Sequence, residues 1–239
     1  MQWKTSISKI SDDQEIIRGQ NLQELIKNKS FAEVIFLILK GSLPNEFENK
    51  MTNALLVACI DHGVGAPSAT VARTVASTGN SLHTAVSAGI QTLGDLHGGA
   101  IEGSAKFFQE NVGESDLENL LKNLKEKKVR IPGFGHKVLS HDHRTDSLFT
   151  IAKETGFFGK HCQFAMDTEV VLNKISSKPL PLNIDGSMAA IISDMGFDWK
   201  IAKGFFIIGR VPGLVAHVFE QLQSGEGVKR VDESEIEYI

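Results

Sequence analysis

The chain has 239 residues, of which 41% are hydrophobic and 23% charged, as expected for a globular protein with a buried core. Its formal net charge of −4 gives no reason to expect nucleic acid or a membrane as a partner. The two cysteines, Cys59 and Cys162, lie in apolar surroundings and argue against a disulfide scaffold or a cysteine zinc site. The first residues are too polar for a signal peptide, and no apolar run approaches the roughly 20 residues that span a bilayer, so we expect a cytoplasmic protein.

Five helices are expected in the first half of the chain, after an extended, polar lead-in over residues 1–20. Asn21 and Ser30 are typical helix N-caps, and each is followed three residues later by a glutamate, the capping-box spacing. Glycine and proline then separate segments rich in small residues, which suit closely packed helices. The expected helices begin after Asn21, run from Ser30 to Gly41, and cover 45–62, 68–76 and 82–93.

The second half also has a helical pattern. The expected helices lie within 105–128 and cover about 146–153, 162–175, a stretch through Ile191, and 200 to about 222, with a kink near Pro212. Strand alternation is weak throughout, so the sequence predicts an all-α fold. The charged middle third predicts a large helical domain of residues 1–103 and 190–239 and a smaller inserted helical domain of residues 104–189.

Glycine-flanked histidines are the first candidates for chemistry. The stretch Ile131-Pro132-Gly133-Phe134-Gly135 lets the backbone approach a ligand closely, and His136 follows at once, where an imidazole can transfer a proton near pH 7. His62 precedes Gly63, and His97 lies in a Leu-His-Gly-Gly sequence. Each histidine could instead be structural.

The run His141-Asp142-His143, together with His136, is an alternative candidate as a metal site. Its spacing fits no standard ligand pattern, and a His-x-His run in a loop is commonly solvated. We therefore expect no metal.

Asp185 is the candidate acid or base. Apolar neighbours precede it, and partial removal from water raises the pKa of a carboxyl group, although Asp185 could instead cap a helix. Arg210 lies in an apolar helical segment, so an anion from the protein or a substrate should meet it. Arg144 and Arg230 lie on polar segments and could be solvated surface charges, but the planar arginine fork also suits carboxylate binding.

Several motifs together resemble the citrate synthase superfamily. They comprise the N-terminal helical segments, Asp61-His62-Gly63, the Ala72–Thr78 run, Leu96-His97-Gly98-Gly99-Ala100, Ile131 to His136, and Asn183-Ile184-Asp185. Leu182–Gly186 and Ile208-Gly209-Arg210 are similar to the branch that contains citryl-CoA lyase and the C-terminal module of ATP citrate lyase. One departure is that His143 stands where the family customarily has proline.

The resemblance implies a citrate synthase-like fold with the active site in a cleft between two helical domains. It implies that His97, His136 and Asp185 are catalytic: His136 at the hydroxyl or ketone oxygen, His97 at the thioester carbonyl, and Asp185 at the acetyl methyl carbon. The substrate carboxylates would be held by His62, Arg144, Arg210 and Arg230, with Arg230 reaching a neighbouring subunit's site. The backbone of Ile131, Pro132, Gly133, Phe134 and Gly135 would hold the adenine end of coenzyme A.

The implied reaction is cleavage of citryl-CoA to acetyl-CoA and oxaloacetate by retro-Claisen chemistry. The alternatives are a compact citrate or 2-methylcitrate synthase and a CoA-binding helical module without catalysis. The resemblance implies a CoA thioester and oxaloacetate or citrate as ligands, no permanently bound cofactor, and a homodimer or higher homo-oligomer.

Overall fold

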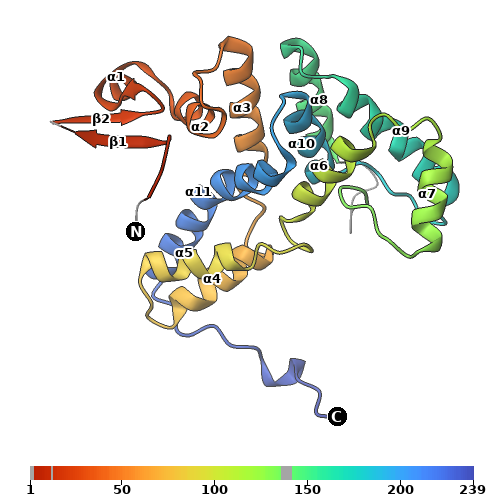
Figure 1. The fold of residues 1–239 in the computed structure, drawn as a ribbon. Helices are drawn as coiled ribbons and strands as arrows, with labels where there is room; N and C mark the ends of the chain where they lie inside the picture. Colours follow the sequence, from red (N-terminus) through yellow and green to blue (C-terminus); the bar gives the residue numbers. More distant parts are fainter. Residues whose placement is uncertain (1–2, 12, 136–141) are drawn as a thin grey trace.

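The computed structural model describes residues 3–11, 13–135 and 142–239, and most of this part of the chain is helical (Figure 1). The described residues form eleven α-helices and one small sheet, so the expected helical fold class is confirmed. The helices within residues 100–194 lie together on one side of Figure 1, while the two helices within residues 67–91 pack on the long helix Ala202–Gln223.

The sheet was not expected from the sequence. Strands β1 (Ser8–Ser11), β2 (Gln14–Ile17) and β3 (Gln20–Asn21) form an antiparallel sheet in the order β1-β2-β3, with Ser8 opposite Ile17 and Ile16 opposite Asn21. The strands are too short to show a clear alternation of polar and apolar residues. Arg18 links the sheet to the helices, because its guanidinium donates two hydrogen bonds to the Ile38 carbonyl, at 3.1 and 3.0 Å.

The first three helices are α1 (Leu22–Asn28), α2 (Phe31–Lys40) and α3 (Glu46–Ala58). The predicted N-caps are confirmed: Asn21 accepts backbone N–H groups of α1, and Ser30 forms a full capping box with Glu33. Helix α3 ends at Ala58, four residues before the predicted end at His62. This early end leaves residues 59–63 as a turn that carries His62.

The middle helices are α4 (Pro67–Ser77), α5 (Leu82–Gln91), α6 (Ala100–Asn111) and α7 (Leu117–Glu126). The helical stretch predicted over 105–128 is therefore two helices, because Gly113 interrupts it and Asp116 caps a new start. Small residues bring helices together as expected: a Cβ on Gly89 of α5 would lie 2.8 Å from the Ser68 carbonyl oxygen of α4.

The remaining helices are α8 (His143–Thr155), α9 (Lys160–Ile175), α10 (Ile184–Asp194) and α11 (Ala202–Gln223), with 3-10 turns η1 (Trp199–Ile201) and η2 (Glu233–Glu235). Helix α10 is the centre of the main core, and Met188 to Ile192 are all fully buried. A second, smaller core joins α4, α5 and α11. The division into residues 1–103 with 190–239 and 104–189 stays a prediction.

Helix α11 corrects the expectation that no apolar run is long enough for a bilayer. Among the residues that the structure describes, Trp199–Gln223 has the length and composition of a membrane span. It nevertheless packs against α3, α4, α5 and α6, continues through Pro212, and buries Phe205 and Arg210. We therefore interpret α11 as a core helix.

Candidate active site

Asp185 lies in the first turn of α10, but it does not cap that helix. The N-cap is Asn183, whose side-chain oxygen accepts the Gly186 N–H at 3.2 Å. The amide of Asn183 donates to the Gly135 carbonyl at 2.9 Å, and its backbone N–H donates to the Gly133 carbonyl at 3.0 Å. The start of α10 is thus joined to the glycine loop, and the Asp185 carboxyl group remains available.

The Asp185 carboxyl group is enclosed without full hydrogen bonding. Its Oδ1 atom is inaccessible to solvent and has no hydrogen-bond partner in the described part of the chain. Burial raises the pKa of Asp185 to about 6, although the positive charges of Arg144 and Arg210 act in the opposite direction. A carboxyl group with this pKa can both accept and donate a proton near neutral pH.

The Asp185 side chain lines a cleft of about 780 Å³. The cleft lies between the turn before α6, the exposed face of α6, the glycine loop, the start of α10 and η1. The lining residues are Asp95, Leu96, Gly99, Ala100, Glu102, Gly103, Lys106, Arg130, Pro132, Gly133, Phe134, Asn183, Asp185 and Trp199. Gly133 has a φ of +85°, and a Cβ there would lie 2.5 Å from Ser104 Oγ and 2.7 Å from Gly186 Cα. Glycine is required at this position for the loop backbone to reach α10.

His97 precedes α6, in the same turn as the cleft residues Leu96 and Gly99. Its Nε2 accepts the Ser68 backbone N–H at 3.2 Å and lies 2.9 Å from Ser68 Oγ. Because a backbone N–H can only donate, Nε2 carries no proton, and the neutral ring carries it on Nδ1. Burial lowers the pKa of His97, and the nearby charges of Arg210 and His62 lower it further. The ring is therefore a neutral hydrogen-bond donor through Nδ1.

Arg210 is buried on α11, and the hydrogen bond that it forms within the described part of the chain is to a backbone carbonyl. Its Nε donates to the Cys59 carbonyl at 2.7 Å, and its guanidinium stacks on Phe206 with 4.9 Å between Cζ and the ring centroid. No carboxylate forms an ion pair with Arg210 among the described residues, and burial lowers the pKa of this guanidinium. The terminal N–H groups are left for an anionic ligand.

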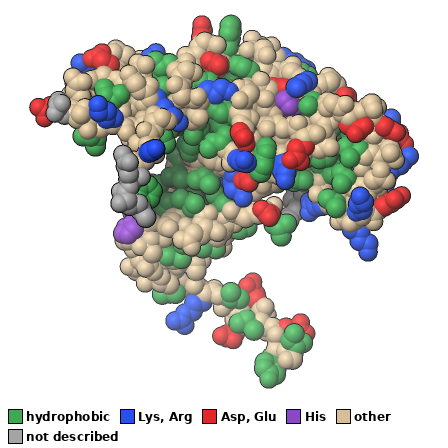
Figure 2. Space-filling view, viewed as in Figure 1, with side chains coloured by type: hydrophobic (Ala, Val, Ile, Leu, Met, Phe, Trp, Pro, Cys, Tyr) green, Lys and Arg blue, Asp and Glu red, His purple; other side chains and the backbone are tan. Residues whose placement is uncertain are grey.

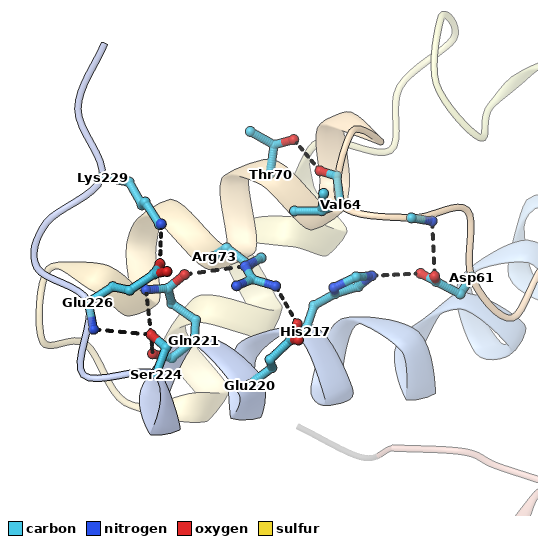
Figure 3. Close-up of polar contacts among 11 residues, drawn as sticks. Asp61, Val64, Thr70, Arg73, His217, Glu220, Gln221, Ser224, Glu226 and Lys229 are labelled. Atoms are coloured by element: carbon cyan, nitrogen blue, oxygen red, sulfur yellow. Dashed lines mark hydrogen bonds and ion pairs between the residues drawn. The ribbon is translucent and has the colours of Figure 1, made fainter. Parts of the chain in front are cut away.

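Helix α11 contacts the turn of residues 59–63, which carries His62; Figure 3 shows the contact between His217 of α11 and Asp61 of this turn. In addition to the Arg210 bond, Gly213 lies so close that a Cβ would be 2.3 Å from the Ile60 carbonyl oxygen. One turn further along, His217 Nε2 lies 3.0 Å from Asp61 Oδ1, and the other Asp61 oxygen accepts the Gly63 N–H at 2.9 Å. Residues at positions i, i+3 and i+7 of α11 therefore fix the backbone on both sides of His62.

Arg144 lies in the first turn of α8 and is held by a buried carboxylate. Its Nε and Nη2 donate to the two oxygens of Asp142, at 2.9 and 2.8 Å, and only 1% of Asp142 is exposed. This pairing occupies Asp142 and argues against it as a metal ligand. In the described part of the chain, no group of three histidine, cysteine or acidic side chains is placed to bind a metal.

Five of the predicted polar residues lie close enough for their charges to act on one another. They are His62, His97, Arg144, Asp185 and Arg210. The charges of Arg144 and Arg210 act on Asp185, and those of Arg210 and His62 act on His97. Of the predicted CoA loop, Pro132, Gly133 and Phe134 line the cleft. Arg230 is not part of this group, because it is exposed on the C-terminal segment, which extends away from the helices in Figure 1. His136 and His141 lie outside the described residues.

Three residues that position the site were not identified from the sequence. Ser68 orients His97, Asn183 caps α10, and Asp142 holds Arg144. Asn183 offered a sequence signal, since asparagine is a favoured N-cap and a glycine follows three residues later. Ser68 acts on His97, 29 positions along the chain, and no local pattern marks it. Asp142 also offered a local signal, since aspartate is a favoured N-cap and α8 begins directly after it.

Comparison with known proteins shows which family the chain matches. The family model "Citrate synthase, C-terminal domain" matches residues 45–231. Citrate synthase 2 of Bacillus subtilis is 31% identical over 218 residues, which cover 90% of this chain and 58% of that protein. A probable ATP-citrate synthase of Dictyostelium discoideum is 29% identical over 97% of this chain and 41% of that protein. The chain thus spans about half the length of these curated relatives.

A solved structure matches over a greater share of its length. The citryl-CoA lyase from Hydrogenobacter thermophilus has a TM-score of 0.93 and 49% identity to this chain, and the match covers 99% of this chain and 94% of that one.

The tautomer and the pKa of His97 can be tested by NMR. In the ¹⁵N NMR spectrum of the folded protein, the His97 ring should show a protonated Nδ1 and an unprotonated Nε2 at pH 7, and should titrate below the ordinary value of 6.5. Because the unfolded chain takes up this proton more readily, His97 should lower the stability of the fold as the pH falls below about 6.5. Ser68→Ala keeps the backbone donor and should keep the tautomer. A proton on Nε2 in the wild-type protein would contradict the assignment.

Proposed function

The chain belongs to the citrate synthase family, and we propose that within this family it is a citryl-CoA lyase, which cleaves citryl-CoA to acetyl-CoA and oxaloacetate. The observation that carries the proposal is the likeness to a citryl-CoA lyase across nearly the whole of both chains. The site supports it, because the enclosed Asp185 carboxyl group lines the cleft, and the positive charges of Arg144 and Arg210 act on it. The neutral His97 imidazole lies in the turn that carries the cleft residues Leu96 and Gly99, and the charge of Arg210 acts on it as well.

Cleavage is a retro-Claisen reaction. A base removes the hydroxyl proton of the citryl group, the carbon–carbon bond breaks to form the ketone of oxaloacetate, and the bond electrons pass to the acetyl-CoA fragment as an enolate. We assign the base to His136 from its motif, since this residue lies outside the described part of the chain.

His97 and Asp185 complete the reaction. The Nδ1–H of His97 donates to the thioester oxygen, where negative charge develops, and a neutral donor held in advance stabilises that charge without reorganisation. Asp185 then gives its proton to the terminal carbon to form the methyl group. A pKa near 6 leaves part of the Asp185 population protonated at neutral pH, which this step requires.

The cationic groups fit the anionic substrate. Arg210 and Arg144, with His62, would hold the carboxylates of the four-carbon half. The loop from Ile131 to Gly135 would receive the adenine end of coenzyme A. Lys106 and Arg130, which line the same cleft, would face its phosphates. No permanently bound cofactor is part of this proposal.

We also propose a cytoplasmic homodimer in which Arg230 enters the partner's site. Figure 2 shows hydrophobic side chains gathered in a hollow over α11, between the N-terminal elements and α4 and α5. A groove of about 470 Å³ between α2, α3 and α11 has Phe31, Val57 and Ile60 exposed along it. The C-terminal segment that carries Arg230 also exposes apolar side chains, at Val228, Val231, Ile236, Tyr238 and Ile239. A second copy would cover both surfaces.

The activity is tested with two reaction mixtures. Purified protein should convert citryl-CoA to acetyl-CoA and oxaloacetate without releasing free CoA, and Asp185→Asn should lower kcat at least a hundredfold while CoA affinity stays within a few-fold. Acetyl-CoA and free CoA are followed by chromatography. Faster release of free CoA from acetyl-CoA plus oxaloacetate would show a citrate synthase instead, and inactivity in both mixtures with CoA bound would show a binding module.

The shared site is tested by mixing subunits. Asp185→Ala and Arg230→Ala proteins should each be nearly inactive, but equal amounts that are unfolded and refolded together should regain about a quarter of wild-type activity, because half of the dimers are mixed and each has one intact site. Each variant refolded alone is the control. No recovery in mixed dimers, or an active Arg230→Ala protein, would exclude the role of Arg230.

A further inference from the structure

We propose that Asp142 is a positioning residue that couples two parts of this site: it orients the Arg144 guanidinium toward the substrate and fixes the first turn of α10, which carries Asp185. The identity of the substrate rests on the proposed function, whereas the contacts of Asp142 are independent of it.

Asp142 is a buried carboxylate that accepts four hydrogen bonds from described residues. Its Oδ1 accepts the Nε of Arg144 at 2.9 Å and the Arg144 backbone N–H at 3.2 Å. Its Oδ2 accepts the Nη2 of Arg144 at 2.8 Å and the Ile184 backbone N–H at 3.0 Å. These bonds and the charge of Arg144 hold the pKa of Asp142 below its usual value despite its burial, so it is ionised at neutral pH.

This pairing determines which edge of Arg144 a substrate can meet. A guanidinium has two edges that can bind a carboxylate with two hydrogen bonds, one formed by Nε with an Nη and one formed by both Nη atoms. Asp142 occupies the first edge. The second edge has no partner within the described part of the chain, and the Arg144 side chain is 32% exposed. Arg144 is thereby held with one bidentate edge free for a substrate carboxylate.

The bond to Ile184 connects this arginine to the catalytic helix. Ile184 is the first residue of α10, and the N–H groups of a first helical turn have no partner within the helix. Asn183 accepts one of these groups, from Gly186, and Asp142 accepts that of Ile184. Asp142 is also the N-cap of α8, so one carboxylate joins the starts of two helices and fixes Arg144 relative to Asp185.

Asp142 also affects the charge around Asp185. Its negative charge opposes the charge of Arg144, and the two act on the Asp185 pKa in opposite directions. Arg210 of α11 acts in the same direction as Arg144. The other charged groups that line the cleft are Asp95, Glu102, Lys106 and Arg130, and on α9 Glu169 accepts the Leu182 N–H. Removing the charge of Asp142 leaves Arg144 uncompensated, so the Asp185 carboxyl group should then titrate at lower pH.

Asp142→Asn separates this role from helix capping, because asparagine is as good an N-cap as aspartate. In the condensation direction, the variant should raise the KM for oxaloacetate at least tenfold, leave the KM for acetyl-CoA within twofold, and move the acid limb of kcat/KM to lower pH. Asp116→Asn, which changes the N-cap of α7 in the same way, is the matched control and should keep wild-type kinetics. Thermal melting of both variants reports any loss of folding.

A measurement without turnover keeps the inference separate from the proposed function. The Asp185 carboxyl carbon, followed by ¹³C NMR, should titrate near 6 in the wild-type protein and at lower pH in Asp142→Asn. If the wild-type protein is inactive, the proposed function fails and this titration still tests Asp142. Should Asp142→Asn not fold, Asp142→Glu keeps the charge and should keep the titration while raising the KM for oxaloacetate. An unchanged oxaloacetate KM together with an unchanged Asp185 titration would overturn the inference.

Discussion

The site depends on keeping one carboxyl oxygen of Asp185 enclosed and unpaired. A buried polar atom without a hydrogen bond costs about 1–3 kcal/mol, so the surrounding fold has to hold Asp185 in this state. It does so by placing the N-cap at Asn183, two residues earlier, and by bringing the backbones of Gly133 and Gly186 into contact. If Asp185 capped α10 itself, the backbone N–H groups would stabilise its ionised form and lower its pKa.

The same environment keeps the imidazole of His97 neutral. Burial opposes charge on both groups, so it raises the pKa of Asp185 and lowers that of His97. Arg144 and Arg210 remain positively charged beside them. The result is a site with a carboxyl group that can gain or lose a proton near neutral pH, a neutral hydrogen-bond donor and fixed cations, which suits an anionic substrate that passes through an enolate.

The structure also shows how far the sequence could predict this arrangement. The N-caps Asn21 and Ser30 were predicted because capping is a local interaction, and Arg210 stood out as a charge in an apolar helix. The N-terminal sheet was missed because its strands have four residues or fewer. Asp142 was assigned only to a possible metal site, since its bond to Ile184 spans 42 positions of the chain and leaves no local pattern.

The central claim is that His97 and Asp185 act on one thioester enolate, and hydrogen exchange tests it most directly. Acetyl-CoA is incubated with the protein and oxaloacetate in D₂O, and deuterium in its methyl group is measured by mass spectrometry. We expect exchange with the wild-type protein, and exchange at least a hundredfold slower with either Asp185→Asn or His97→Gln. Exchange at the wild-type rate in either variant, or none in a wild-type protein that binds acetyl-CoA, would contradict the account.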